Sequence, residues 1–258
     1  MAAIPIATLG GLIGLGGAEF RLPVLVGPLG YAARRAVPLN LSVSIVTICA
    51  SLAVRSRSLL LDPVEPFVAP MLGLIAGAVI IAAAGPALLH RLSDARLERI
   101  ILWLLVVIGG ALIAEAFLPN TLEGGFLPDD TATRVVGGFI FGLGIGLVSS
   151  LLGVAGGEVI IPTLVFAFGA GIKTAGTASL LVSLPTVAVG IVRYARRGAY
   201  DRTALRETVA PMSFGSVIGA VIGGSLVGTV PADVLKFGLG CILIMSAVRI
   251  FRGAHSPG

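Results

Sequence analysis

The sequence predicts an all-α polytopic membrane protein with two inverted-topology repeats, each a glycine-broken helical hairpin followed by three transmembrane helices. Three observations lead to this fold class. Of the 258 residues, 56% are hydrophobic and 12% are charged, about half the charged fraction of an ordinary soluble domain. Several long runs contain no charged residue, and one glycine-rich segment occurs twice, 139 residues apart.

The charge-free runs supply the transmembrane helices. A helix needs roughly 20 apolar residues to cross the hydrocarbon core, and five runs approach or exceed that length: Ala36–Val54, Pro66–Leu89, Val135–Gly157, Thr174–Val192 and Thr208–Ala232. Two weaker segments become long enough if the bases beside them extend to the membrane interface; they are Ile100–Ala114 and Phe237–Val248. No run alternates apolar and polar residues with period two, so a transmembrane β-barrel is excluded.

The two repeats begin with copies of one motif. Gly14–Val26 reads GLGGAEFRLPVLV, and Gly153–Val165 reads GVAGGEVIIPTLV. Further matches follow in order at nearly constant offsets: Arg34 with Lys173, Asn40 with Ser179, Ser44 with Ser183, Ala69–Met71 with Ala210–Met212, and Gly77–Ile80 with Gly219–Ile222. A duplication therefore divides the chain into a first transmembrane repeat (1–118), a polar linker (119–134) and a second transmembrane repeat (135–258).

The loop charges indicate how the repeats are oriented. The stretch from Val135 to Ile172 holds 38 residues, with Glu158 as its one charged residue; a single straight helix of that length would far overshoot a ~30 Å core. If each broken segment returns to the side that it entered, 12 Lys and Arg residues fall on one face and five on the other; if each crosses once, the split is 10 to seven. Positive-inside logic favours the first arrangement. Three net crossings per repeat then invert the second repeat, and the C-terminus is expected on the cytoplasmic side.

The two breaks predict a substrate site. Gly16 and Gly17, and likewise Gly156 and Gly157, let the backbone turn so that N–H groups and the positive end of the following helix face an anion. A bilayer tolerates a broken backbone only where protein or a water-filled cavity satisfies it, and duplicated breaks are typical of secondary transporters. The alternative is that these small residues only allow close helix packing.

The charged residues of the two motifs are candidates for binding and coupling. Glu19 and Glu158 occupy matched positions, and a carboxylate at membrane depth costs roughly 2.5–3.5 kcal/mol, so each is expected to be protonated or paired, as suits ion coupling. Alternatively, the hairpin tips reach the headgroups and water solvates both. Arg21 has Ile160 as its counterpart. Its planar fork is suited to an oxyanion, although it could equally pair with Glu19.

Hydroxyl and amide side chains follow each break at spacings that place them on one helical face. They are Asn40, Ser42, Ser44 and Thr47 in the first repeat, and Thr177, Ser179, Ser183 and Thr186 in the second. Of these, Asn40, Ser44, Ser179 and Ser183 are the candidates for lining the permeation path. Equally, such hydroxyls can bond back to the carbonyls of their own helix.

Other classes of function find little support in the sequence. The bases lie in short loops, so the positive-inside rule explains the net charge of +5 without nucleic acid. His90 and His255 are the only histidines, too few ligands for haem or a di-metal centre, and no cofactor is expected. Asp129 and Asp130 lie in a loop without a DDxxD pattern, and no HExxH, nucleophile–base set or Walker A sequence occurs. Neither an enzyme nor an ATP-driven pump is indicated.

The duplicated motif, the two four-segment halves and the length of the chain resemble the sulfite exporter TauE/SafE family, also grouped as the 4-toluene sulfonate uptake permeases. The resemblance implies a secondary active transporter that moves sulfite or related organosulfur anions across a bacterial inner membrane. It implies alternating access driven by an ion gradient, with protons as one candidate, and it assigns the substrate site to Gly14–Pro23 and Gly153–Pro162. A passive channel for anions or small solutes is the alternative that the residues leave open.

Overall fold

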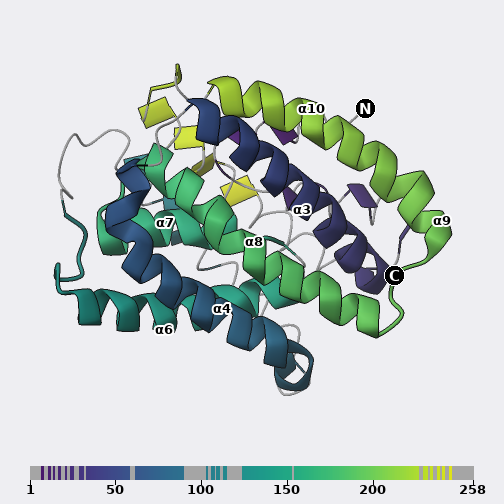
Figure 1. Ribbon diagram of the computed structural model, residues 1–258, viewed down its shortest axis with the longest axis horizontal. Coiled ribbons are helices and arrows are strands. Elements are labelled where there is room, and N and C mark those ends of the chain that lie inside the picture. Colours follow the sequence, from purple (N-terminus) through teal and green to yellow (C-terminus); the bar gives the residue numbers. More distant parts are fainter. Residues whose placement is uncertain are drawn as a thin grey trace.

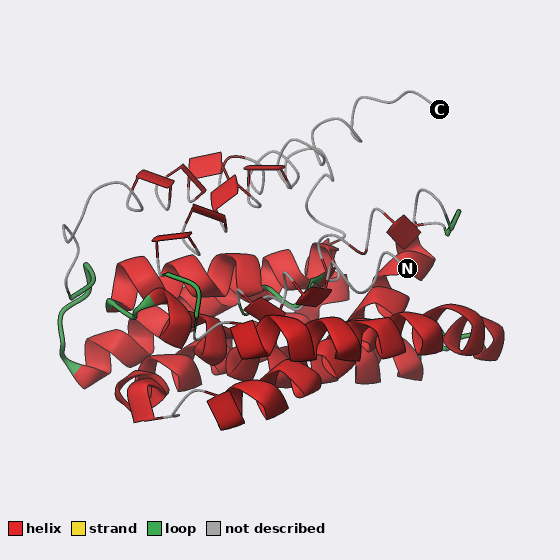
Figure 2. Ribbon diagram, turned by 90° about the horizontal axis from the view of Figure 1, so that it is seen from above, coloured by secondary structure: helices red, strands yellow, loops and turns green. Residues whose placement is uncertain are grey.

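The computed structural model describes residues 33–58, 62–89, 124–152 and 154–226 continuously, and short stretches or single positions within 7–31, 103–114 and 229–245. Most of these residues are helical and short loops join the helices, with no strand in the described part of the chain (Figures 1 and 2). The described elements are α3 (Ala33–Ser58), the 3-10 helix η1 (Asp62–Phe67), α4 (Val68–Leu89), α6 (Thr131–Leu152), α7 (Gly157–Phe168), α8 (Ile172–Arg196), α9 (Arg202–Ala204), the π-helical turn η2 (Leu205–Val209) and α10 (Ala210–Leu226).

Five of the described helical segments are long and apolar enough to cross a membrane: Arg35–Ser56, Pro63–Ala83, Thr131–Ser150, Ile172–Arg196 and Arg202–Leu226. Each overlaps one of the five charge-free runs, so the sequence located these spans correctly. Large apolar side chains such as Leu72, Ile140 and Phe214 are exposed, as expected for helix faces that contact lipid rather than water. Most of the two weaker segments, Ile100–Ala114 and Phe237–Val248, lies outside the described residues.

Glycines allow α4 and α6 to pack backbone against backbone. A Cβ added at Gly138 would lie 2.4 Å from the Pro70 carbonyl oxygen, one at Gly142 would lie 2.4 Å from that of Leu74, and one at Gly146 would lie 2.6 Å from that of Ala78. Because both residue numbers rise together, the two helices run parallel. Small residues at such interfaces are typical of membrane helices, whose association depends on close van der Waals packing.

The second broken segment enters and returns at the same end of the molecule. The backbone N–H groups of Phe126 and Leu127, which precede α6, donate to the carbonyls of Phe166 and Ala167 at the end of α7, at 2.9 and 3.1 Å. The segment is therefore a hairpin. Its legs are unequal, since α6 has 22 residues and α7 has 12, about 33 and 18 Å of helix; only the first leg is long enough to cross the hydrocarbon core.

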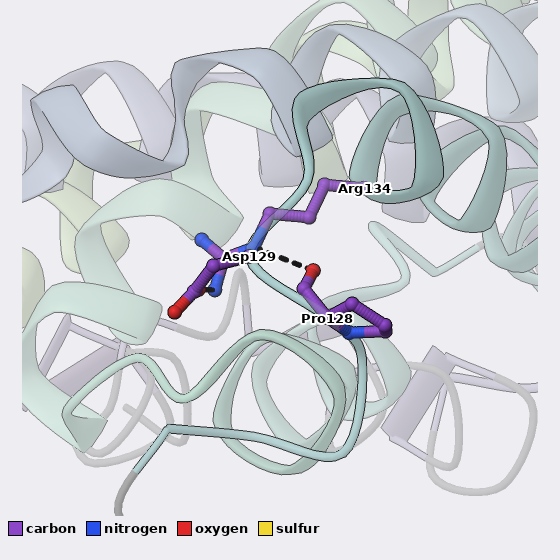
Figure 3. Close-up of polar contacts among 3 residues, drawn as sticks. All are labelled: Pro128, Asp129 and Arg134. Atoms are coloured by element: carbon purple, nitrogen blue, oxygen red, sulfur yellow. Dashed lines mark hydrogen bonds and ion pairs between the residues drawn. The ribbon is translucent and has the colours of Figure 1, made fainter.

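The loop before α6 is fixed by its two aspartates. Asp130 accepts hydrogen bonds from the backbone N–H and the hydroxyl of Thr133, both at 2.9 Å, and these bonds lower the pKa of the exposed Asp130 carboxyl. Asp129 forms an ion pair with Arg134, whose Nε also donates to the Pro128 carbonyl at 3.4 Å (Figure 3). Both acids thus hold the start of a helix, which is a structural role.

The repeat of the sequence is visible in the backbone. Gly17 and Gly156 occupy matched positions in the breaks, and both have left-handed φ values, 66° and 80°. Gly30 and Gly169, also matched, have φ values of 67° and 72°. The residue after each of these donates its N–H six residues back, Tyr31 to Leu25 at 3.0 Å and Ala170 to Leu164 at 2.9 Å, a Schellman-type helix end.

The matched helices α3 and α8 cross at the centre of the molecule and run antiparallel. Leu41, near the start of α3, contacts Gly190, near the end of α8, whereas Arg55, near the end of α3, bonds to Thr177, near the start of α8. The outer helices pack reciprocally: α10 of the second repeat lies on α3, and α4 of the first lies on α8 (Figure 1). We call the end where α3 begins and α8 ends end A, and the opposite end B.

Candidate functional site

A fully buried arginine lies just beyond the first break. Arg21 has 0% of its surface exposed. Its Nη1 donates to the hydroxyls of Thr47 and Ser216 at 2.8 and 3.1 Å, Nη2 donates to Ser44 Oγ at 2.9 Å, and Nε donates to Asn40 Oδ1 at 3.4 Å. Three of these partners lie on α3 and one on α10, so side chains of both repeats surround one guanidinium group.

The oxygens around Arg21 are themselves held in place. Ser44 donates its hydroxyl proton to the Asn40 carbonyl at 2.8 Å, and Thr47 donates to the Val43 carbonyl at 2.9 Å. Asn40 Nδ2 donates to the Ala18 carbonyl at 2.8 Å, one residue past the left-handed Gly17. Ser44 and Thr47 thus each bond back to their own helix, as one of the two sequence-based interpretations expects, and each also accepts a hydrogen bond from Arg21. Ser42 likewise donates to a carbonyl of its own helix, that of Pro38, at 3.2 Å.

The second break has the same backbone and different chemistry. Gly156 adopts a left-handed conformation before α7, and Gly157 and Glu158, in the first turn of that helix, are buried, with Glu158 3% exposed. The counterpart of Arg21 is Ile160, which packs in the apolar core together with Leu74, the counterpart of Ser216 at an offset of 142. The second break is thus lined by apolar side chains at the positions where the first break holds the Arg21 cation.

The structure brings only some of the candidate residues together. Gly17, Arg21, Asn40 and Ser44 meet in one polar cluster, and Ser179 joins the same break by donating to the Gly14 carbonyl at 2.6 Å. The first break therefore contacts both α3 and α8. Ser183 is buried on α8, without a hydrogen bond to Arg21 among the described contacts. Gly16 and Glu19 lie outside the described residues.

Two residues of the buried polar network were missed by sequence reasoning. Ser216 is one of three serines in the run Thr208–Ala232, and its counterpart Leu74 gives no signal of a shared role. Arg55 directly follows the charge-free run Ala36–Val54, a position where a base is expected at the interface. Instead its side chain is 0% exposed. One signal in the sequence could have drawn attention to Arg55: the apolar helix that contains it, Arg35–Ser56, continues past this arginine.

The guanidinium of Arg55 binds backbone carbonyls from both repeats. Nη2 donates to the Gly11 and Leu12 carbonyls, both at 2.9 Å, and Nε to that of Gly11 at 3.2 Å. Nη1 donates to Thr177 Oγ1 at 3.0 Å and to the Lys173 carbonyl at 3.4 Å. Gly11 and Leu12 form the helical turn before the left-handed Gly14, so Arg55 satisfies carbonyls at a helix C-terminal end.

Comparison with known families gives a match over the second repeat. The family model of the sulfite exporter TauE/SafE matches residues 138–257, which include most of α6, the second break, α7, α8 and α10. Neither the curated proteins nor the solved structures give a match. The first repeat lies outside the matched range and is related to it by the internal duplication. Over residues 138–257 the chain matches the model of the sulfite exporter TauE/SafE family, the same family that the repeated motif resembles.

Proposed function

We propose that this multi-pass membrane protein is a secondary active transporter that carries sulfite or a related organosulfur anion by alternating access. The observation that carries the proposal is the buried Arg21 at the first break, enclosed by hydroxyl and amide groups from both repeats. The family match supplies the class of substrate. A bacterial inner membrane is the location that the family resemblance implies.

The groups around Arg21 fit the chemistry of a small oxyanion. A guanidinium presents several N–H donors in a rigid plane, and this fork binds two oxygens of one anion. The hydroxyls of Ser44, Thr47 and Ser216 now accept from it, and each can turn to donate to an anion instead. A bound anion would replace these neutral hydroxyl acceptors and form charge-assisted hydrogen bonds with the Arg21 guanidinium, which is buried away from bulk water.

The antiparallel packing of the matched helices supports the inverted repeat. If α3 and α8 both cross the bilayer, their antiparallel course requires that the two repeats enter it from opposite sides. The reciprocal contacts of α10 with α3 and of α4 with α8 are those expected from a two-fold axis in the membrane plane. Such pseudosymmetry lets two nearly equivalent packings open the site to either side in turn.

Glu158 is the candidate for proton coupling in the described part of the chain. It is buried in the first turn of α7, where desolvation opposes its charge and the positive end of the helix favours it. A carboxyl balanced in this way can take up and release a proton as its surroundings change. Glu19 is proposed for the same role in the first repeat.

The proposal is tested by tracer flux into proteoliposomes. We expect saturable uptake of radiolabelled sulfite that competes with an organosulfonate and not with chloride. Arg21→Gln is expected to abolish the flux, whereas Arg206→Gln, which changes an exposed arginine of η2, is expected to leave it unchanged. Glu158→Gln is expected to remove the pH dependence. Chloride flux as large as sulfite flux, without saturation, would instead identify a passive anion channel.

A further inference from the structure

A cavity opens at end A beside the tip of the second hairpin. It lies between the end of α6 and the last turns of α8, with the end of α4 as a further wall. Its polar lining residues are Ser149, Ser150, Thr186, Arg193, Tyr194 and Arg197, and the hydroxyls of Ser149 and Thr186 donate to the carbonyls of Val154 and Val182. Ser149 also borders the break, since a Cβ added at Gly156 would lie 3.7 Å from its Cβ. Ser149 therefore stands between the cavity and the second break.

The residues at matched positions differ between the two ends of the central helix pair. At an offset of 139, the positions of Gly190, Arg193 and Tyr194 on α8 correspond to Ser51, Val54 and Arg55 on α3. Glycine in place of serine removes a side chain from the wall, and a tyrosine replaces the arginine that fills the space at end B.

The contacts between outer and central helices are preserved at both ends, which shows that the two places are equivalent. At end B, a Cβ added at Gly224 of α10 would lie 2.9 Å from Val54 of α3. At end A, the matched Arg193 of α8 donates to the carbonyl of Ala82 of α4, and Ala82 corresponds to Gly224 at the offset of 142. The two regions thus share one backbone arrangement and differ in their side chains.

At end B the matched space is closed by Arg55. Its guanidinium donates to the Gly11 and Leu12 carbonyls at the tip of the first broken segment and to Thr177 at the start of α8. Gly223 of α10 closes the same tip from the other side, because a Cβ added there would lie 2.1 Å from the Thr8 carbonyl oxygen. The buried Arg55 side chain thus fills the space between α3, the tip of the first broken segment and the start of α8, and its hydrogen bonds join these three segments.

We propose that the cavity at end A is an oxyanion-binding vestibule of the transport path and that Arg55 closes the equivalent vestibule at end B. This inference rests on the proposed function. Arg193 uses one nitrogen to hold Ala82, so the rest of its fork faces an anion from the cavity wall. Ser150 Oγ is buried and makes no hydrogen bond in the described structure, so it is available to donate to the same anion. Arg197, exposed at the mouth, raises the local anion concentration.

Cysteine accessibility tests the closed and open ends without depending on transport. In a background of Cys49→Ala and Cys241→Ala, Ser150→Cys is expected to react with a membrane-impermeant thiol reagent from the end A side only. Thr177→Cys, beside Arg55, is expected to react at least tenfold more slowly from either side. Adding Arg55→Ala is expected to make Thr177→Cys reactive from the end B side. Equal reactivity of the two cysteines in the presence of Arg55, or no reaction of Ser150→Cys, would overturn the inference.

Transport kinetics test the binding role of Arg193. Arg193→Gln is expected to raise the KM for sulfite uptake about tenfold with little change in maximal rate, and Arg193→Lys to restore part of the affinity. Arg206→Gln, an exposed arginine outside the cavity, is the matched control with an unchanged KM. If Arg193→Gln left KM unchanged while sulfite flux persisted, the vestibule would be refuted and the transporter would stand. Absence of flux in the unmodified protein would refute the proposed function, while the accessibility result would still decide which end is closed.

Discussion

Replacing Gly142 with alanine tests the backbone-to-backbone packing of α4 against α6. The added Cβ would lie 2.4 Å from the Leu74 carbonyl oxygen and 2.9 Å from the Leu74 Cα. Close carbon–oxygen contacts between packed helices lie at about 3.3–3.6 Å, so the helices must separate by roughly 1 Å at this point. The obstacle is backbone on a neighbouring helix, and rotation of a side chain cannot relieve it.

The expected cost follows from the loss of contact along the interface. A gap of 0.5–1 Å removes about a quarter to a half of the dispersion energy of each atom pair, and overpacking of this kind costs about 1–3 kcal/mol. Lipid offers no hydrophobic compensation, since helix association in a membrane depends on close packing. We therefore expect Gly142→Ala to lower the free energy of unfolding by about 1–3 kcal/mol, measured by equilibrium unfolding in mixed micelles.

The matched control lies on the same helix two residues further on. Gly144 is exposed, and a Cβ added there meets no atom within 4 Å. Gly144→Ala is expected to be neutral or to stabilise the helix by up to about 1 kcal/mol, because alanine loses less backbone entropy than glycine. Equal changes in the free energy of unfolding for the two substitutions would refute the packing argument, because helix propensity alone would then account for both.

Three further predictions concern single polar or backbone features. Ser216→Ala removes one acceptor from the buried guanidinium of Arg21 and is expected to lower the free energy of unfolding by about 1.5–3 kcal/mol. Ser213→Ala is the neutral control in the same unfolding assay, because the buried Ser213 hydroxyl makes no hydrogen bond in the described structure. Gly156→Ala places a side chain at φ 80° and is expected to cost about 1–2 kcal/mol and to slow sulfite uptake, whereas Gly171→Ala, at φ −60° in open space, is not. Hydrogen bonds lower the pKa of Asp130 in the folded protein, so the stability that its carboxylate contributes is complete above the unfolded pKa and is lost as pH falls through the folded pKa. Asp130→Asn is expected to remove that part of the acid dependence of the melting temperature. An unchanged pH profile would contradict the stabilising role of Asp130.

The positions of the breaks could be predicted from the sequence because glycine is a local signal. A left-handed backbone excludes most side chains, so the glycine pairs at 17 and 156 and at 30 and 169 mark turns without reference to any partner. The five described spans could be predicted for a similar reason. A charge-free run of sufficient length is stable in the bilayer whatever it packs against.

The expected equivalence of the two half-sites could be judged only in part. The sequence shows that Arg21 of the first repeat is matched by Ile160 in the second. The structure adds that this asymmetry extends to the neighbouring helices, since Ser216 bonds to Arg21 whereas its counterpart Leu74 packs in the apolar core with Ile160. The hairpin legs also differ from the equal halves that length alone suggests, because the glycine break falls after α6 has already reached the full thickness of the core.

The sequence by itself predicted an all-helical membrane protein, located the five described spans and indicated the family that residues 138–257 match, since each depends on composition or on short motifs. Only the tertiary structure decided that Arg55 is buried, that Ser216 reaches Arg21 and that a cavity opens beside the last turns of α8. The physical reason is that a membrane helix is apolar on every side. With no water-facing stripe to orient it, which of its few polar residues turn inward depends on the neighbouring helices, and those are brought together by contacts far apart in the chain.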